Sequence, residues 1–164
     1  MTLVRIGSDR RWPLRSSGGA AVLVVAALAI GLATAQLIPV RRTNPPLVGD
    51  VAAPPPVESI LHRACYDCHS NETRWPWYSY VAPVSWVIVN HVEEARRQIN
   101  FSEWSGYYPG TRRRKLQWMG RALHAEKMPP WYYTLTHTDA RLTAADREQL
   151  ESWIESALTP SSNK

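Results

Sequence analysis

The chain has 164 residues, of which 45% are hydrophobic, and its formal net charge is +5. This length allows one domain and an appendage. The charge is uneven, because residues 1–35 carry four arginines and one aspartate, whereas the remaining chain carries 15 basic and 13 acidic residues. The nearly neutral main part argues against a nucleic-acid-binding protein, although arginines interleaved with aromatic residues do occur in it.

An uncharged run extends from Ser16 to Val40. About 20 apolar residues suffice to cross a bilayer, and arginines before such a run favour a cytoplasmic N-terminus. We therefore predict a basic cytoplasmic segment at 1–17 and a transmembrane anchor at 18–40. The alternative is a signal peptide, because an A-x-A cleavage pattern ends at Ala35. Either interpretation places the rest of the chain outside the cytoplasmic membrane, on its periplasmic side.

The segment that follows, at 41–56, is rich in proline and is predicted to be a linker. Proline fixes φ and removes a hydrogen-bond donor, so a long helix or a central strand is excluded here. Two arrangements remain open. The segment could be a stalk that holds the following domain away from the membrane, or a strap that lies against the domain surface.

The only two cysteines, Cys65 and Cys68, belong to a C-x-x-C-H pentapeptide that ends at His69. Thiols at this spacing can form thioethers with the two vinyl groups of one porphyrin, and the histidine is then held under the iron. We predict one covalent haem c, with His69 as the proximal iron ligand. The alternatives are a redox dithiol, a zinc site that also uses His62, and a chance match.

Hydrophobic spacing predicts helices in the rest of the chain. Apolar residues at i, i+3, i+4 and i+7 occur at 57–64 and 116–123, and further apolar stripes occur at 84–99 and 150–157. The predicted fold class is an all-α, cytochrome c-like mono-haem domain at 57–158, followed by a flexible tail at 159–164. The stripe at 84–99 contains His91, which is expected to be a core residue, with a distal ligand role as the alternative.

The loop at 71–83 is rich in aromatic side chains. We predict that Trp75 and Trp77 contact the haem, which needs apolar residues on its faces and edges. Arg74 is predicted to donate hydrogen bonds to the haem propionates. The alternative is an ordinary packed loop without haem contacts.

Two groups of basic residues are expected on solvated helix faces. One is the pair Arg96 and Arg97, and the other is the run at 112–115. The functional alternative for the run is a docking patch for an acidic redox partner, which would raise the association rate.

Met128 is the predicted distal iron ligand. It precedes two prolines, and a residue before proline is driven out of the helical region. A thioether ligand needs such a stiff, non-helical loop, whereas Met119 lies on a predicted buried helix stripe and is expected in the core. A core role is also the alternative for Met128.

The C-x-x-C-H motif, the tryptophan-rich loop, N-F-S-E-W at 100–104 and M-P-P-W at 128–131 occur in this order. In this combination the chain closely resembles the bacterial haem-binding domain family of small membrane-anchored c-type cytochrome-like proteins, from about Gln36 to Leu158. The resemblance implies a mostly helical mono-haem domain attached at Cys65 and Cys68. It also implies His69 as proximal ligand and suggests Met128 as distal ligand.

The expected function is single-electron transfer at the outer face of the cytoplasmic membrane, with redox partner proteins of unknown identity and no nucleic acid. An electron carrier needs no catalytic side chain, so none is predicted. The alternatives are a haem peroxidase, with His91 or His124 as acid–base residue, and a haem-based sensor. Both alternatives need an open or displaceable distal ligand.

Overall fold

The computed structural model describes residues 18–159, and this part of the chain is helical, without a strand. The cytoplasmic segment predicted at 1–17 and residues 160–164 of the predicted tail lie outside the described residues. The chain divides into two compact units between Ile38 and Pro39. The predicted all-α fold class is confirmed.

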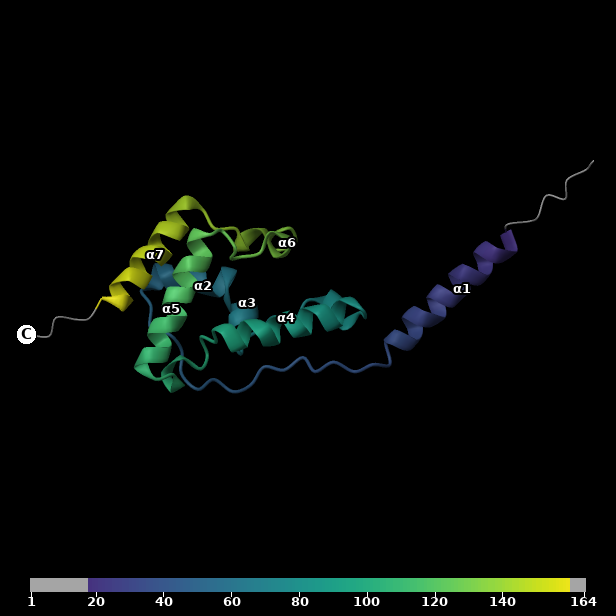
Figure 1. Ribbon diagram of the computed structural model, residues 1–164, viewed down its shortest axis with the longest axis horizontal. Helices are drawn as coiled ribbons and strands as arrows, with labels where there is room; N and C mark the ends of the chain where they lie inside the picture. Colours follow the sequence, from purple (N-terminus) through teal and green to yellow (C-terminus); the bar gives the residue numbers. More distant parts are fainter. Residues whose placement is uncertain (1–17, 160–164) are drawn as a thin grey trace, which may run out of the picture. The chain divides into compact units, whose positions relative to one another are not determined.

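The elements (Figure 1) are α1 (Gly18–Ala35), α2 (Pro55–Ala64), α3 (Tyr66–His69), η1 (Trp77–Tyr80), α4 (Val84–Gln98), η2 (Trp104–Gly106), α5 (Pro109–His124), α6 (Trp131–Thr134), η3 (Thr138–Ala140) and α7 (Ala144–Leu158).

Helix α1 forms most of the described part of the first unit. It consists of apolar and small residues without a charge, and none of its 18 residues, all of them described, is buried. At about 1.5 Å per residue it is about 27 Å long, close to the roughly 30 Å of a hydrocarbon core. Residues 18–159 therefore contain one helix, near the N-terminus, that is long and apolar enough to cross a membrane.

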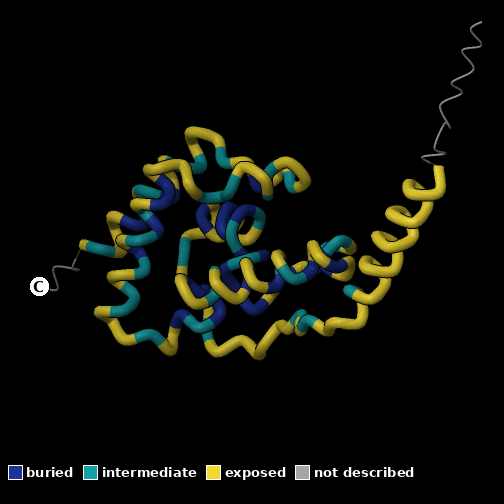
Figure 2. Tube along the Cα trace, turned by 45° about the vertical axis from the view of Figure 1, so that its right-hand side comes forward, coloured by how far each residue is buried: buried dark blue, intermediate teal, exposed yellow. Residues whose placement is uncertain are grey.

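The core of the second unit lies between α2, α5 and α7, whose inner faces are buried (Figure 2). Helix α2 buries all four residues of its predicted stripe, and α5 buries three of the predicted four, with Gly120 half-buried. Each fully buried aliphatic side chain stabilises the fold by about 1.5–3 kcal/mol. The buried side chains of these three helices are Val57, Ile60, Leu61, Ala64, Leu116, Met119, Ala122, Leu123, Leu150, Trp153 and Ile154.

The proline-rich segment at 41–56 lies against the second unit. The Gly49 N–H donates to the Ser102 carbonyl oxygen at 3.1 Å, and the Tyr66 hydroxyl donates to the Asp50 carboxylate at 2.6 Å. The strap alternative therefore describes this segment, and we call it the strap below. Its proline content serves this role, because a chain with fixed φ angles loses little entropy when it is laid down in an extended form.

Arg96 on α4 fastens the strap. Its guanidinium donates to the Ser70 carbonyl at 2.7 Å, to the Thr43 carbonyl at 2.9 Å, to Asn44 Oδ1 at 3.2 Å and to Thr73 Oγ1 at 2.8 Å. These acceptors come from three separate places in the chain. The expectation that Arg96 only faces solvent is wrong. Its planar guanidinium carries several N–H donors, so it can bind oxygens of the strap and of the segment after α3 at the same time.

The other basic residues follow the expectation in part. Arg97 is exposed and pairs with Glu94 at 2.6 Å, one turn away. Within the basic run, Lys115 donates to the Gln98 carbonyl at the end of α4 at 2.6 Å. A cation at a helix C-terminus interacts favourably with the unpaired carbonyls there. Part of the run thus holds the helices together.

Candidate functional site

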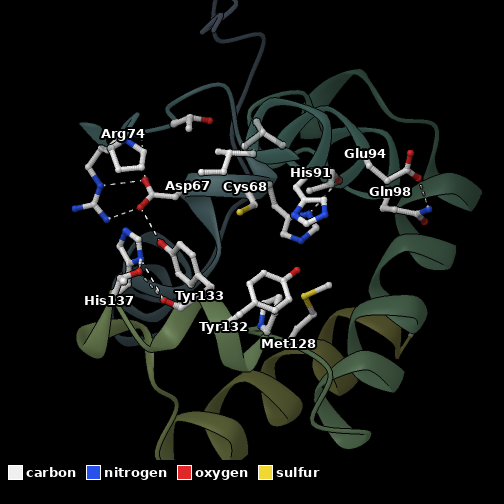
Figure 3. Close-up of a pocket in the computed structure, with 18 of the residues that line it drawn as sticks. Asp67, Cys68, Arg74, His91, Glu94, Gln98, Met128, Tyr132, Tyr133 and His137 are labelled. Atoms are coloured by element: carbon white, nitrogen blue, oxygen red, sulfur yellow. Dashed lines mark hydrogen bonds and ion pairs between the residues drawn. The ribbon is translucent and has the colours of Figure 1, made fainter. Parts of the chain in front are cut away.

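A cavity of about 490 Å³ lies inside the second unit, between α3 and α4 on one side and residues 128–137 on the other. Its lining is mostly apolar, and its volume falls within the range of about 300–1,000 Å³ that is usual for cofactor and ligand sites. Figure 3 shows Cys68 and His91 on one side of this cavity and Met128 and Tyr132 on the other.

His69 lies in the cavity wall and is buried. Its Nδ1 is 3.0 Å from the Ala95 carbonyl oxygen and 3.2 Å from that of Ile99, at the end of α4. Both partners are acceptors, so Nδ1 carries the proton and Nε2 keeps its lone pair. Burial lowers the pKa of His69 below its usual 6.5, which favours the neutral ring. This is the state and the orientation of a metal-ligating imidazole.

A buried polar network fixes the exit of the C-x-x-C-H motif. The Phe101 N–H donates to the His69 carbonyl at 2.8 Å. Next to it, Asn100 Nδ2 donates to Asn71 Oδ1 at 2.8 Å, and the Asn71 N–H donates to Ser102 Oγ at 2.9 Å. The residues of the N-F-S-E-W segment thus hold the backbone that carries His69.

The two cysteines are free thiols in different surroundings. Cys68 lines the cavity, whereas Cys65 packs against the core and is absent from the described lining. Burial raises the pKa of Cys65 to about 12 and that of Cys68 to about 11. A reactive dithiol needs thiolates, which a lowered pKa provides. The raised pKa values therefore do not favour the redox dithiol.

The zinc alternative lacks a suitable group of ligands in the described part of the chain. In residues 18–159, no three His, Cys, Asp or Glu side chains are grouped so that they could hold a metal ion. The ring of His62 stacks on that of Tyr66, with their centroids 3.9 Å apart.

Met128 lines the cavity from outside any helix. Helix α5 ends at His124, and two hydrogen bonds close its last turn. The Glu126 N–H donates to the Leu123 carbonyl and the Lys127 N–H to the Ala122 carbonyl, both at 2.9 Å. This is a Schellman motif, with Glu126 at a φ of 52° where glycine is usual. The motif turns the chain out of α5 two residues before Met128, while Met119 lies in the core as predicted.

Asp67, between the two cysteines, is the centre of a second network at the cavity wall. Arg74 Nε lies 3.0 Å from Asp67 Oδ1, and Arg74 Nη2 lies 3.1 Å from Asp67 Oδ2. The guanidinium therefore forms a bidentate ion pair with the carboxylate. Tyr133, on α6, donates its hydroxyl hydrogen to Asp67 Oδ2, and the two oxygens lie 2.9 Å apart (Figure 3). Arg74 lines the cavity, but the part of its guanidinium that faces Asp67 is already engaged.

Trp75 and Trp77 are absent from the described residues that line the cavity, and Trp77 is 78% exposed. Other aromatic residues take their place, and sequence reasoning did not single them out as cavity residues. The ring of Trp118 lies 6.1 Å from that of His69. The aromatic lining residues are Tyr78, Trp118, Tyr132 and Tyr133. The segment at 71–83 has no periodicity that indicates that Tyr78 rather than Trp77 points inward, and Trp118 is not part of the apolar stripe of α5.

The apolar stripe on α4 faces the cavity rather than the core. Ile88, His91, Val92 and Ala95 line the cavity, while Val84 and Val87, also on the predicted stripe, are exposed. Periodicity identified part of the lining face but could not distinguish a core from a cavity. The expectation that His91 is a core residue is wrong, because His91 is exposed. Of the two histidines considered for acid–base roles, His91 lies in the lining, whereas His124 is not among the described lining residues.

The fold and the site define an all-α domain whose apolar cavity is lined by a buried neutral histidine, a cysteine and a methionine. The model of the haem-binding domain family matches residues 30–156, which is more than half of the chain. The chain therefore belongs to the haem-binding domain family. No curated protein and no solved structure matches it. Membership of this family supports haem as the occupant of the cavity.

Proposed function

We propose that this domain binds one haem covalently, through thioethers to Cys65 and Cys68, and that it carries single electrons. The observation that carries the proposal is the arrangement of His69 and Met128 on one apolar cavity, with the Nε2 lone pair of His69 unprotonated. The family match supports haem itself. The C-x-x-C-H spacing supports covalent attachment.

The haem, once bound, supplies one-electron chemistry at its iron. His69 would provide a nitrogen ligand to the iron, and the carbonyls of Ala95 and Ile99 hold its ring in one orientation. Met128 would provide a neutral thioether, which would favour reduced iron and raise the reduction potential. The apolar lining limits the access of water, which also tunes the potential.

A haem peroxidase or haem-based sensor is the second candidate, and the position of His91 in the cavity lining is the observation that favours it. Such a protein needs a distal ligand that leaves readily. Carbon monoxide added to the reduced protein separates the two functions, because a carrier with a fixed methionine binds it slowly or not at all.

Covalent attachment has a direct test. Denaturing gel electrophoresis followed by a haem peroxidase stain should show colour at the mass of the protein, and the pyridine haemochrome spectrum should be that of a c-type haem. A double variant, Cys65→Ser with Cys68→Ser, should lose the stain, since no other cysteine remains in the chain. If the wild-type protein loses its colour under denaturing conditions, or contains zinc instead of iron, the proposed attachment is wrong.

We further propose that α1 anchors the domain to the outer face of the cytoplasmic membrane, with the N-terminus inside. The length and composition of α1 and the arginines before it support this. Mass spectrometry of the mature protein should find the uncleaved N-terminal segment. A mature chain that starts at Gln36 would instead mean a cleaved signal peptide and a domain that is not anchored.

A further inference from the structure

We infer that η1 and the first turns of α4 rest on the surface of the bilayer, with Trp77 and Tyr80 among the lipid headgroups. This inference rests on the proposed anchoring by α1 and goes beyond it. An anchored domain could be held at any height and in any orientation, whereas the inference names the face that contacts lipid.

The surface concerned is apolar, aromatic and exposed. Trp77, Tyr80, Val81, Val84 and Val87 are exposed large hydrophobic residues on η1, on the turn after it and on α4. Contiguous apolar surface on a soluble domain marks an interaction site. Tryptophan and tyrosine prefer the membrane interface, because each combines an apolar ring with a polar tip.

The charge pattern of this surface fits a lipid partner. Residues 73–92 contain no acidic residue, and Arg74 is the only lysine or arginine among them. Twenty residues without a carboxylate allow the surface to approach lipid without the desolvation of a negative charge. Arg42, whose guanidinium lies over the ring of Tyr80, and its chain neighbour Arg41 supply cations for lipid phosphates.

Chain length brings this surface to the membrane. Arg42 Nη1 donates to the Ser79 carbonyl oxygen at 3.1 Å, and the Arg42 guanidinium lies 4.2 Å above the ring of Tyr80. The uncharged run ends at Val40. Since α1 is about 27 Å long and a hydrocarbon core about 30 Å thick, the chain leaves the core near Ile38. Four residues then reach at most about 14 Å, so Tyr80 is tied to the headgroup region.

The same constraint argues against a protein partner on this surface. The strap is bound to the domain from Arg42 onward, so little free chain remains to lift the domain from the membrane. A folded partner between this surface and the bilayer would need a longer tether. The short connection between α1 and Arg42 therefore favours lipid over a folded protein as the partner of this surface.

Spin labels on the full-length protein in vesicles of phosphatidylcholine and phosphatidylglycerol test the inference. Labels are introduced by Trp77→Cys and, separately, by Val84→Cys. A label at Leu28→Cys reports on the anchor, and one at Tyr108→Cys is the matched control, because Tyr108 is 82% exposed and follows the opposite end of α4. The signal of the unmutated chain is subtracted, which removes any label on the native cysteines.

We expect the ratio of collisions with oxygen to collisions with a water-soluble nickel chelate to be severalfold higher at positions 77 and 84 than at position 108. If position 28 lies in hydrocarbon while position 77 or 84 is as water-exposed as position 108, the docking inference is wrong and the anchor stands. If position 28 is itself in water, the proposed anchoring fails. Shielding of position 77 or 84 from both reagents would indicate a protein contact and would also overturn the inference.

Discussion

Met128→Ala should open the distal side of the cavity while leaving the fold in place. The side chain of Met128 lies on a loop at the cavity edge, outside the core cluster of α2, α5 and α7. Loss of the thioether should abolish the near-infrared sulfur-to-iron charge-transfer band of the oxidised protein, lower the reduction potential and allow carbon monoxide to bind rapidly. Optical spectra, a redox titration and carbon monoxide mixing measure these three effects.

Met119 provides the matched control. It is only 6% exposed within the core of α5, so Met119→Leu keeps the volume and should cost less than about 1.5 kcal/mol of stability. That variant should keep the charge-transfer band and the potential of the wild type. An unchanged spectrum of the Met128→Ala protein would show that Met128 is not an iron ligand. His91 would then be tested in the same way.

Arg96→Ala should lower the free energy of unfolding by about 2–4 kcal/mol, although Arg96 is not predicted to touch the haem. The substitution removes four hydrogen bonds that Arg96 donates, two to the strap at Thr43 and Asn44 and two to the segment after α3 at Ser70 and Thr73. Hydrogen bonds to a charged group contribute about 1.5–3 kcal/mol each when sheltered and less when exposed, as two of these are. Urea unfolding of the haem-loaded protein measures the loss.

The adjacent residue is the control for this second prediction. Arg97→Ala removes only an exposed pair with Glu94, one turn away, and should change the free energy of unfolding by no more than about 0.5 kcal/mol. Arg96→Lys should give an intermediate loss, because an ammonium group keeps the charge but not the planar fork. Equal losses for Arg96→Ala and Arg97→Ala would contradict the role of Arg96 as a fastener.

The longer helices of the domain, the core position of Met119 and the non-helical position of Met128 could be predicted, because each depends on local sequence. The apolar spacing at 57–64 requires one buried helix face, and the two prolines after Met128 exclude a helix there. The role of Arg96 could not be predicted, since its partners lie 23 to 53 residues away. Nothing in its own helix distinguishes it from Arg97.

The aromatic loop shows a different limit. The prediction that Trp75 and Trp77 contact the haem rests on composition, because a haem needs large apolar neighbours. Composition gives the number of aromatic residues but not their direction, and the 3-10 helix that begins at Trp77 leaves this side chain 78% exposed. The cavity uses Trp118 and Tyr133 instead, from segments that meet only in the folded domain.

The Asp67 network determines where the cavity opens most readily. None of the four residues of α6, all within the described chain, is buried, so the hydrophobic effect does little to hold this helix. Tyr133 ties this helix to α3 through its hydroxyl, which donates to Asp67, and its ring stacks on that of His137 with the centroids 4.1 Å apart. Local unfolding starts where few apolar contacts must be broken. Amide hydrogen exchange should therefore be fastest at this wall, and a cofactor that is delivered to a folded domain would enter past α6 rather than past α4.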